Sequence, residues 1–179
     1  MAGAIMTAAK DSWNTPDELL EPVREFFKGQ IGLDPCWNAS SITEPKLKFC
    51  LDEGQDGLQL GWGRTTVFVN PPWGKVISLW VQKAVAESEE NGAGVIMLLP
   101  ANTDTKAWQN FVFPHAEAIC FLRGRVTFLD PDTGMPAKQG VTKGASFVYF
   151  GRRSYKEFRD VFGSLGHVIG RVVPTSTQQ

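Results

Sequence analysis

The sequence predicts an α/β fold with a mostly parallel sheet and an antiparallel strand pair toward the C-terminus. Strand-like runs at residues 67–69 and 94–100 are each followed by a polar corner and then by a helical pattern. The second run is continuously apolar, as expected of a strand covered on both faces. Strand–helix–strand–helix succession is typical of doubly wound α/β folds. Two later runs, 126–129 and 145–150, are joined by a long polar loop and predict the antiparallel pair.

Length and composition are those of an ordinary globular protein. A chain of 179 residues fits a single domain, 1–179, for which we expect flexible tails at 1–12 and 174–179. Hydrophobic residues make up 42% and charged residues 21%. No apolar run reaches membrane-spanning length, and the N-terminus lacks the layout of a signal peptide. We therefore expect a cytoplasmic protein with no membrane partner.

Charge and cysteine usage restrict the function further. The formal net charge is −1, so any contact with nucleic acid must come from a local basic patch. Cys36, Cys50 and Cys120 are odd in number and lack C-x-x-C spacing, which argues against a disulfide framework and a zinc site. We expect no metal, and the sequence leaves open whether the protein is a monomer or a dimer.

The first helix is expected directly after Trp13-Asn14-Thr15-Pro16. Thr15 can be its N-cap, Pro16 suits the first helical position, and Glu18 would complete a capping box. Apolar residues at helical spacing continue to Gly29, a plausible stop. Pro22 lies inside this pattern, so we expect the helix to bend or begin there. From the residues alone, a cap is the favoured role of the Trp13–Pro16 stretch.

A short strand at 31–33 is expected to end at Asp34. If this strand runs beside the one at 67–69, Asp34 lies at the carboxyl edge of the sheet, where a carboxylate can hold a cationic cofactor. The alternative, which the residues alone favour, is that Asp34 initiates a turn before Pro35. Residues 38–62 show no pattern and are predicted to be irregular, with a solvated acidic cluster and Trp62 packed near the next strand.

The most informative stretch is Asn70-Pro71-Pro72-Trp73, which follows the strand at 67–69. Two prolines cannot continue a ladder, so the chain must turn at the carboxyl end of a parallel strand, where open α/β sheets bind ligands. The Asn70 oxygen and the two proline carbonyls would accept hydrogen bonds from an exocyclic amine. Trp73 would stack on the ring that bears the amine. The alternative is a Pro-Pro turn with a packed tryptophan.

The remaining elements are predicted from periodicity and turn residues. They are helices at 75–90 and from Thr103 to 112, strands at 118–122 and 167–173, and a helix capped by Ser154. Arg123, Arg125, Lys138 and Lys143 lie in or beside the long polar loop, and the residues leave a DNA contact and a solvated rim equally open. His115 and His167 have no neighbouring nucleophile motif and are predicted to be structural or surface residues.

Asn70-Pro71-Pro72-Trp73 resembles the Asn/Asp-Pro-Pro-aromatic motif of S-adenosylmethionine-dependent amino-methyltransferases. The order of the motifs over residues 13–150 resembles the phage-type DNA N6-adenine methyltransferases, small Dam-like enzymes. The matching segments are Trp13-Asn14-Thr15-Pro16, Leu33-Asp34-Pro35-Cys36, Asp56-Gly57-Leu58 with Trp62, Asn70–Trp73, Leu98-Leu99-Pro100 with Thr103-Asp104-Thr105, and Arg123-Gly124-Arg125 with Phe128.

The resemblance implies a Rossmann-like methyltransferase sheet that binds S-adenosylmethionine and double-stranded DNA, for a phage protein in the host cytoplasm. It implies catalytic residues Asn70, Pro71, Pro72 and Trp73, and cofactor-binding residues Trp13, Thr15, Pro16, Asp34, Pro35, Cys36 and Asn70. Substrate contacts are expected from Trp73, Arg123, Arg125, Lys138 and Lys143. The chain departs from the wider methyltransferase pattern because Cys36-Trp37-Asn38 stands where a glycine-rich turn is usual.

Two other functions remain open from the sequence. The same motif would accept another amino group, in RNA adenine, cytosine N4 or a protein glutamine. A non-catalytic DNA-binding module could also retain this fold.

Overall fold

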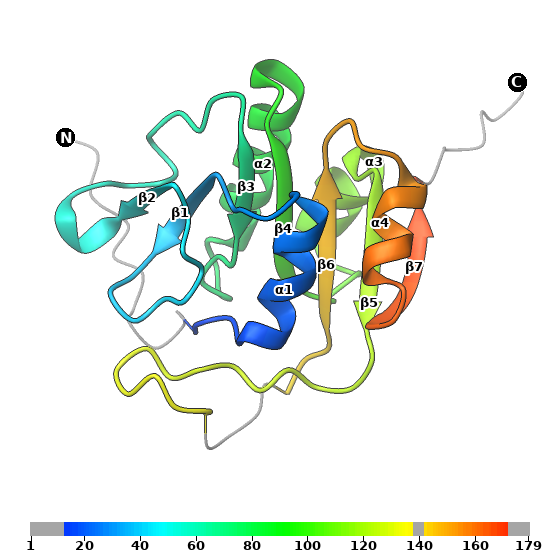
Figure 1. Cartoon of the computed structure of the whole chain (residues 1–179). Coiled ribbons are helices and arrows are strands. Elements are labelled where there is room, and N and C mark those ends of the chain that lie inside the picture. Colours follow the sequence, from blue (N-terminus) through cyan, green and yellow to red (C-terminus); the bar gives the residue numbers. More distant parts are fainter. Residues whose placement is uncertain (1–12, 138–141, 172–179) are drawn as a thin grey trace, which may run out of the picture.

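The computed structural model describes residues 13–137 and 142–171. Both expected tails and Lys138 lie outside these residues. Within them one sheet has the strand order β2-β1-β3-β4-β6-β5-β7 (Figure 1). Its strands are β1 (Leu33–Trp37), β2 (Leu47–Cys50), β3 (Thr66–Val69), β4 (Gly94–Pro100), β5 (Ala118–Leu122), β6 (Ala145–Phe150) and β7 (Gly166–Gly170).

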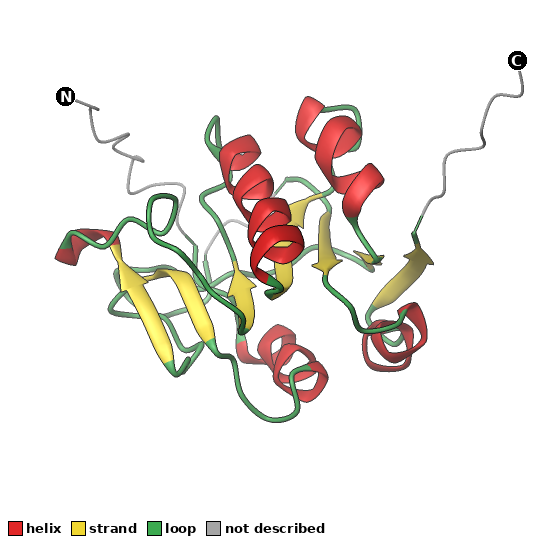
Figure 2. Cartoon of the chain, turned by 90° about the horizontal axis from the view of Figure 1, so that it is seen from above, coloured by secondary structure: helices red, strands yellow, loops and turns green. Residues whose placement is uncertain are grey.

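Helices cover both faces of the sheet (Figure 2). On one face, α1 (Asp17–Phe26) and α4 (Tyr155–Phe162) bury residues such as Leu20, Phe26, Phe158 and Phe162 against Phe68 and Phe147. On the other face, α2 (Ile77–Asn91) and the π-helix η3 (Trp108–Val112) pack on Val67, Val69 and Met97. The short segments η2 (Leu51–Glu53) and α3 (Phe113–His115) complete the helical elements of the described residues.

The sheet is parallel in its first half and antiparallel in its second. β2, β1, β3 and β4 run parallel, β6 is antiparallel to both β4 and β5, and β7 is antiparallel to β5. The mixed α/β sheet is as predicted, but the predicted pairing of 126–129 with 145–150 is wrong. Residues 126–129 form no strand, and only Leu129 makes isolated bridges, to Asn14 and Pro136. Val126 and Phe128 instead bury their side chains in the α1-side core, which explains their apolar alternation.

Two other strand predictions need correction. β2 lies within the region that we expected to be irregular, and it pairs Leu47 with Leu33 at the edge of the sheet. It has only four residues, two of them exposed, so it shows no alternation in the sequence. β1 begins at Leu33 and not at residue 31, so Asp34 lies inside the strand. A register irregularity between Asp34 and Trp37 bends β1 where a clean strand end was expected.

The helix predictions are correct for α2 and α4 and partly wrong for α1. Gly92 ends α2 with φ 74°, and Ser154 and Glu157 form a capping box on α4. Helix α1 runs through Pro22 without a break, because its apolar face is buried on both sides of that residue. Thr103 does not cap the following helix, because helical structure begins only at Lys106 and no side chain caps η3. No helix in the described part of the chain is long and apolar enough to cross a membrane.

Candidate active site

Asn70 follows β3 directly, and its side-chain amide is held by the segment that precedes α1. Asn70 Nδ2 donates to the Trp13 carbonyl at 2.7 Å and to Thr15 Oγ1 at 3.2 Å. Both amide hydrogens are therefore used within the chain. No described residue donates to Asn70 Oδ1, and Asn70 is only half-buried. The acceptor that the sequence predicted is thus oriented and free.

This contact overturns the predicted role of Thr15 as a helix cap. Pro16, and not Thr15, is the N-cap of α1, and no side chain caps the helix. The Pro16 carbonyl accepts from the backbone N–H groups of Leu19 and Leu20. Thr15 is buried, with 3% of its surface exposed, and its hydroxyl oxygen serves Asn70 instead.

The proline corner offers one free carbonyl and not two. Pro71 and Pro72 are both buried. The Pro72 carbonyl accepts from the Gly74 N–H at 3.0 Å, so the prediction that it points free into the site is wrong. The Pro71 carbonyl accepts from no N–H group among residues 13–137 and 142–171. Asn70 Oδ1 and the Pro71 carbonyl are therefore the two acceptors that the corner can offer to a ligand.

Trp73 is half-buried and held at two points. Its Nε1 donates to the Leu98 carbonyl of β4 at 3.3 Å. The edge of its ring system meets Phe128, with ring centroids 5.2 Å apart and an interplanar angle of 82°. The packed-tryptophan alternative accounts for these contacts, but part of the ring stays accessible. A fixed, partly exposed indole can stack on a planar ligand.

Asp34 lies on β1, the direct neighbour of β3, as predicted. Its carboxylate accepts from Thr43 Oγ1 at 2.7 Å and from the Cys36 N–H at 2.9 Å. Burial raises the pKa of Asp34 to about 6, against the lowering effect of these two hydrogen bonds. The bond to Cys36, two residues on, is typical of a turn-forming aspartate, but β1 continues to Trp37, so the alternative of a turn before Pro35 is wrong. The role of Asp34 toward a cofactor stays a prediction.

Pro35 is packed closely against Gly57, which follows it by 22 residues in the chain. A Cβ on Gly57 would lie 2.2 Å from the Pro35 carbonyl oxygen and 2.9 Å from the Trp80 ring. The Gly57 carbonyl accepts from Trp62 Nε1 at 2.8 Å, which confirms that Trp62 is a packing residue. Burial and the charges of Asp34 and Asp56 raise the pKa of the Cys36 thiol, so it is a neutral packing group.

Three polar residues join these parts and were missed by the sequence analysis. Asn14 Nδ2 donates to Asn38 Oδ1 at 3.2 Å and to Ser40 Oγ at 2.8 Å, and Asn38 Nδ2 donates back to Asn14 Oδ1 at 2.7 Å. The Ser40 hydroxyl also donates to the Pro131 carbonyl. The only signal for this network in the sequence was the Trp13–Pro16 motif. Hydrogen-bond partners that are 24 or more residues apart produce no periodic pattern in the sequence.

A family model described as DNA N-6-adenine-methyltransferase (Dam) matches residues 3–169. The chain belongs to this Dam family. It is also similar to the DNA N-6-adenine-methyltransferase of Haemophilus phage HP1, with 26% identity over 131 residues that cover 73% of each chain. The family match confirms the resemblance found in the sequence and makes the chain an adenine-specific DNA methyltransferase.

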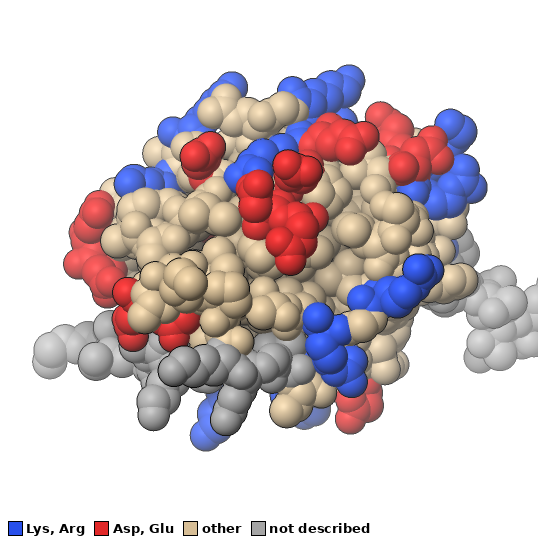
Figure 3. Space-filling model, turned by 60° about the horizontal axis from the view of Figure 1, so that its bottom comes forward, with Lys and Arg blue, Asp and Glu red and all other residues tan. Residues whose placement is uncertain are grey.

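Three of the four basic residues predicted to contact DNA lie among the described residues, two just after β5 and one just before β6. Arg123, Arg125 and Lys143 are exposed and form no ion pair with a described carboxylate. Arg125 Nη1 lies 3.4 Å from where a Cβ on Gly144 would stand, and the Gly144 carbonyl accepts from Ala101 just after β4. Figure 3 shows the bottom of the molecule, with basic side chains grouped at the lower right, apart from an acidic group near the centre.

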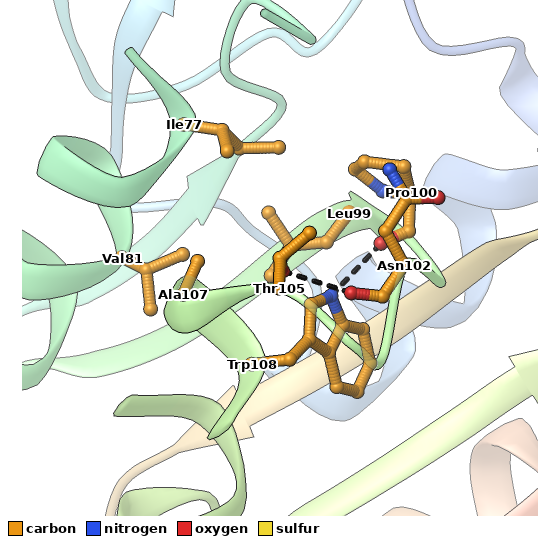
Figure 4. A pocket seen from close by; sticks show the side chains of 8 residues that line it. All are labelled: Ile77, Val81, Leu99, Pro100, Asn102, Thr105, Ala107 and Trp108. Atoms are coloured by element: carbon orange, nitrogen blue, oxygen red, sulfur yellow. Dashed lines mark hydrogen bonds between the residues drawn. The ribbon is translucent and has the colours of Figure 1, made fainter. Parts of the chain in front are cut away.

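A small cavity lies beside the carboxyl end of β4, between α2 and η3 (Figure 4). It measures about 30 Å³ and is lined by Ile77, Val81, Leu99, Pro100, Asn102, Thr105, Ala107 and Trp108. Trp108 Nε1 donates to the Pro100 carbonyl at 2.9 Å across it. Asn70, Pro71, Trp73 and Asp34 are not among its lining residues, so the cavity is separate from the candidate site. Among the described residues no cluster of His, Cys, Asp and Glu could hold a metal ion.

Proposed function

We propose that this Dam-family enzyme transfers the methyl group of S-adenosylmethionine to the N6 amine of an adenine flipped out of double-stranded DNA. The orientation of the Asn70 amide carries this proposal. Trp13 and Thr15 engage its N–H₂ end, which directs Oδ1 away from them. Oδ1, the Pro71 carbonyl and the Trp73 ring then provide two acceptors and a stacking face, which match the two N–H groups and the plane of an adenine.

The N6 amine of a paired adenine is inaccessible within the stack, so the base must leave the duplex. Trp73, whose ring is held by its edge-to-face contact with Phe128, stacks on the flipped base. Asn70 Oδ1 and the Pro71 carbonyl accept the two amine hydrogens, which directs the nitrogen lone pair out of the ring plane toward the methyl donor. Transfer would form the nitrogen–carbon bond as the carbon–sulfur bond of the sulfonium breaks, and a neutral thioether would leave. The methylated amine would then carry a positive charge and lose a proton to solvent, so the chain needs no strong base. Orientation and electrostatics provide the catalysis.

The strand order supports a cofactor site between β1 and β3. The chain passes from β1 to β2 on one side, and then β3 pairs with the other side of β1. In open α/β sheets such a switch point opens a crevice at the carboxyl ends of the strands. The parallel strands and the helices on both faces support a Rossmann-like methyltransferase sheet.

The residues at this crevice suit S-adenosylmethionine, which supplies an electrophilic methyl group and carries a sulfonium and an ammonium. We assign its binding to Trp13, Pro16, Asp34, Pro35 and Cys36 together with Asn70. Thr15 was expected in this set, but its hydroxyl oxygen is engaged by Asn70. With its pKa at about 6, the Asp34 carboxylate is mostly ionised at neutral pH and complements a cation. Where a glycine-rich turn is usual, Asn38 instead ties the end of β1 to Asn14.

The test is nucleoside mass analysis after incubation of the enzyme with methyl-labelled S-adenosylmethionine and duplex DNA. We expect labelled N6-methyldeoxyadenosine. Parallel reactions with RNA and with protein, and analysis of cytosine from the same DNA, separate the alternative amino substrates. Label only in one of these, or no label at all, would overturn the proposal.

A further inference from the structure

We propose that Thr15 is a positioning residue that holds the Asn70 amide with its oxygen toward the target amine. The inference rests on the proposed function, since it concerns the acceptor of that same reaction. Thr15 Oγ1 accepts from Asn70 Nδ2 at 3.2 Å, and the two residues are 55 positions apart in the chain. In this role Thr15 acts through Asn70.

The two ends of a carboxamide have the same shape and opposite hydrogen-bonding character. If the amide turned over, its N–H₂ group would face the amine hydrogens of adenine, and only the Pro71 carbonyl would remain to accept one of them. The Trp13 carbonyl lies 2.7 Å from Asn70 Nδ2 and can only accept, so it selects the N–H₂ end of the amide. The Thr15 hydroxyl oxygen accepts the second amide hydrogen at 3.2 Å and holds the side chain in this orientation. Without that contact the amide is held by one hydrogen bond and rotates more freely.

Thr15 can act in this way because the segment around it is fixed on both sides. The backbone of Asn14 pairs with Leu129 through two hydrogen bonds of 2.9 Å. The side chain of Asn14 is bound to Asn38 and Ser40. On the other side, the buried Pro16 leads directly into α1. The Thr15 hydroxyl is therefore held in place by the fold and does not depend on Asn70 for its position.

Two other roles for Thr15 predict different behaviour. A helix cap is excluded by the structure, because the side chain makes no capping bond. A contact to the cofactor, the role that the family resemblance implies, predicts that loss of the hydroxyl weakens S-adenosylmethionine binding. A positioning role predicts that binding is retained and that the methyl-transfer step slows.

The first experiment reads the Asn70 amide directly, without catalysis. The side-chain N–H₂ signals of Asn70 are assigned in ¹⁵N-labelled protein by their loss in Asn70→Asp. In Thr15→Val these signals should shift and exchange faster with solvent, whereas Thr15→Ser should retain them. Unchanged Asn70 signals in folded Thr15→Val would overturn the inference. If Thr15→Val does not fold, Thr15→Ala repeats the comparison.

The second experiment separates transfer from binding. We expect kcat of Thr15→Val to fall about tenfold, the effect of one hydrogen bond, with Kd for S-adenosylmethionine changed less than about twofold. Thr15→Ser should recover most of the rate. Thr65→Val is the matched control, because this half-buried threonine precedes β3 at its opposite end. An unchanged kcat, or a loss confined to cofactor affinity, would contradict the inference. Absence of adenine methylation by the unaltered enzyme would instead refute the proposed function.

Discussion

Phe128 holds the ring of Trp73 edge to face, at a centroid distance of 5.2 Å. Phe128 is buried in the α1-side core, whereas Trp73 is half-buried. Residues 126–129, which were predicted to form a strand, therefore support Trp73 through Phe128. This contact links the core of the protein to the face that we assign to the flipped adenine.

Replacing Phe128 by a smaller apolar residue should impair catalysis more than folding. In Phe128→Leu the edge contact is lost but most of the buried volume is kept. An edge-to-face pair is worth about 0.5–1.5 kcal/mol, so kcat/KM for DNA should fall by about twofold to tenfold. Steady-state kinetics with a duplex substrate measure this, with Tm as the folding control. A Phe128→Leu enzyme as active as the original, while Trp73→Ala is impaired, would show that Trp73 needs no such support.

Asp34 should make the stability depend on pH in an unusual direction. Its pKa is raised by burial from 3.8 to about 6, so the folded protein binds the proton more tightly than the unfolded chain. The contribution of this group to the free energy of unfolding should therefore fall by up to about 3 kcal/mol as pH rises from about 4 to about 6. Above that pH its contribution should stay level.

The variant Asp34→Asn isolates this effect. It keeps an acceptor for the Cys36 N–H and removes the charge, so it should be more stable than the original at pH 8 and lose that advantage toward pH 4. Urea unfolding at both pH values measures the difference. If the carboxylate holds the cofactor, the same variant binds S-adenosylmethionine more weakly. Equal pH dependence in both proteins would refute the account of Asp34.

Gly57 should not tolerate a side chain. In Gly57→Ala the new methyl would stand 2.2 Å from the Pro35 carbonyl oxygen and 2.9 Å from Trp80, so the Asp34–Cys36 bend must shift. Overpacking of this kind costs about 1–3 kcal/mol, and Tm should fall with it. Gly61→Ala is the matched control, because nothing lies within 4 Å of the added methyl. A Gly57→Ala protein as stable as Gly61→Ala would mean that this contact is not close-packed.

Arg123 and Arg125 should contribute to the salt dependence of DNA binding. If Arg123 and Arg125 contact phosphates, replacement of either by Gln should reduce the slope of log K against log salt by about one. Fluorescence anisotropy of a labelled duplex over a salt series measures the slope. Lys156→Gln is the control, because this exposed lysine on α4 is paired with Asp160. If the arginine variants keep the original slope, Arg123 and Arg125 are solvated and do not contact the phosphates.

Local patterns in the sequence predicted the strand end and the proline corner at Asn70 correctly. Alternating apolar residues before Asn70 and two prolines after it are enough to place a strand end and a rigid corner, because both effects act within a few residues. The continuous apolar run of β4 and the helix cap at Ser154 were predicted for the same reason. The family was evident from the order of such local motifs.

What the sequence could not reveal are contacts between distant residues. Thr15 looked like a helix cap because its hydroxyl suits either role, and only the fold brings Asn70 to it. The apolar residues Val126 and Phe128 alternate like a strand, although they anchor an irregular segment that packs against the core. The Pro72 carbonyl was expected to be free, but the turn returns the Gly74 N–H to it. In each case a tertiary contact decided between locally equivalent structures.

The most direct test of the central claim is methyl transfer to duplex DNA by Asn70→Ala, measured as labelled N6-methyldeoxyadenosine beside the unaltered enzyme. The Asn70 oxygen accepts one of the two amine hydrogens in this account. We therefore predict that the unaltered enzyme labels adenine N6 and that a folded Asn70→Ala protein labels none. Transfer by Asn70→Ala at the original rate would contradict the account.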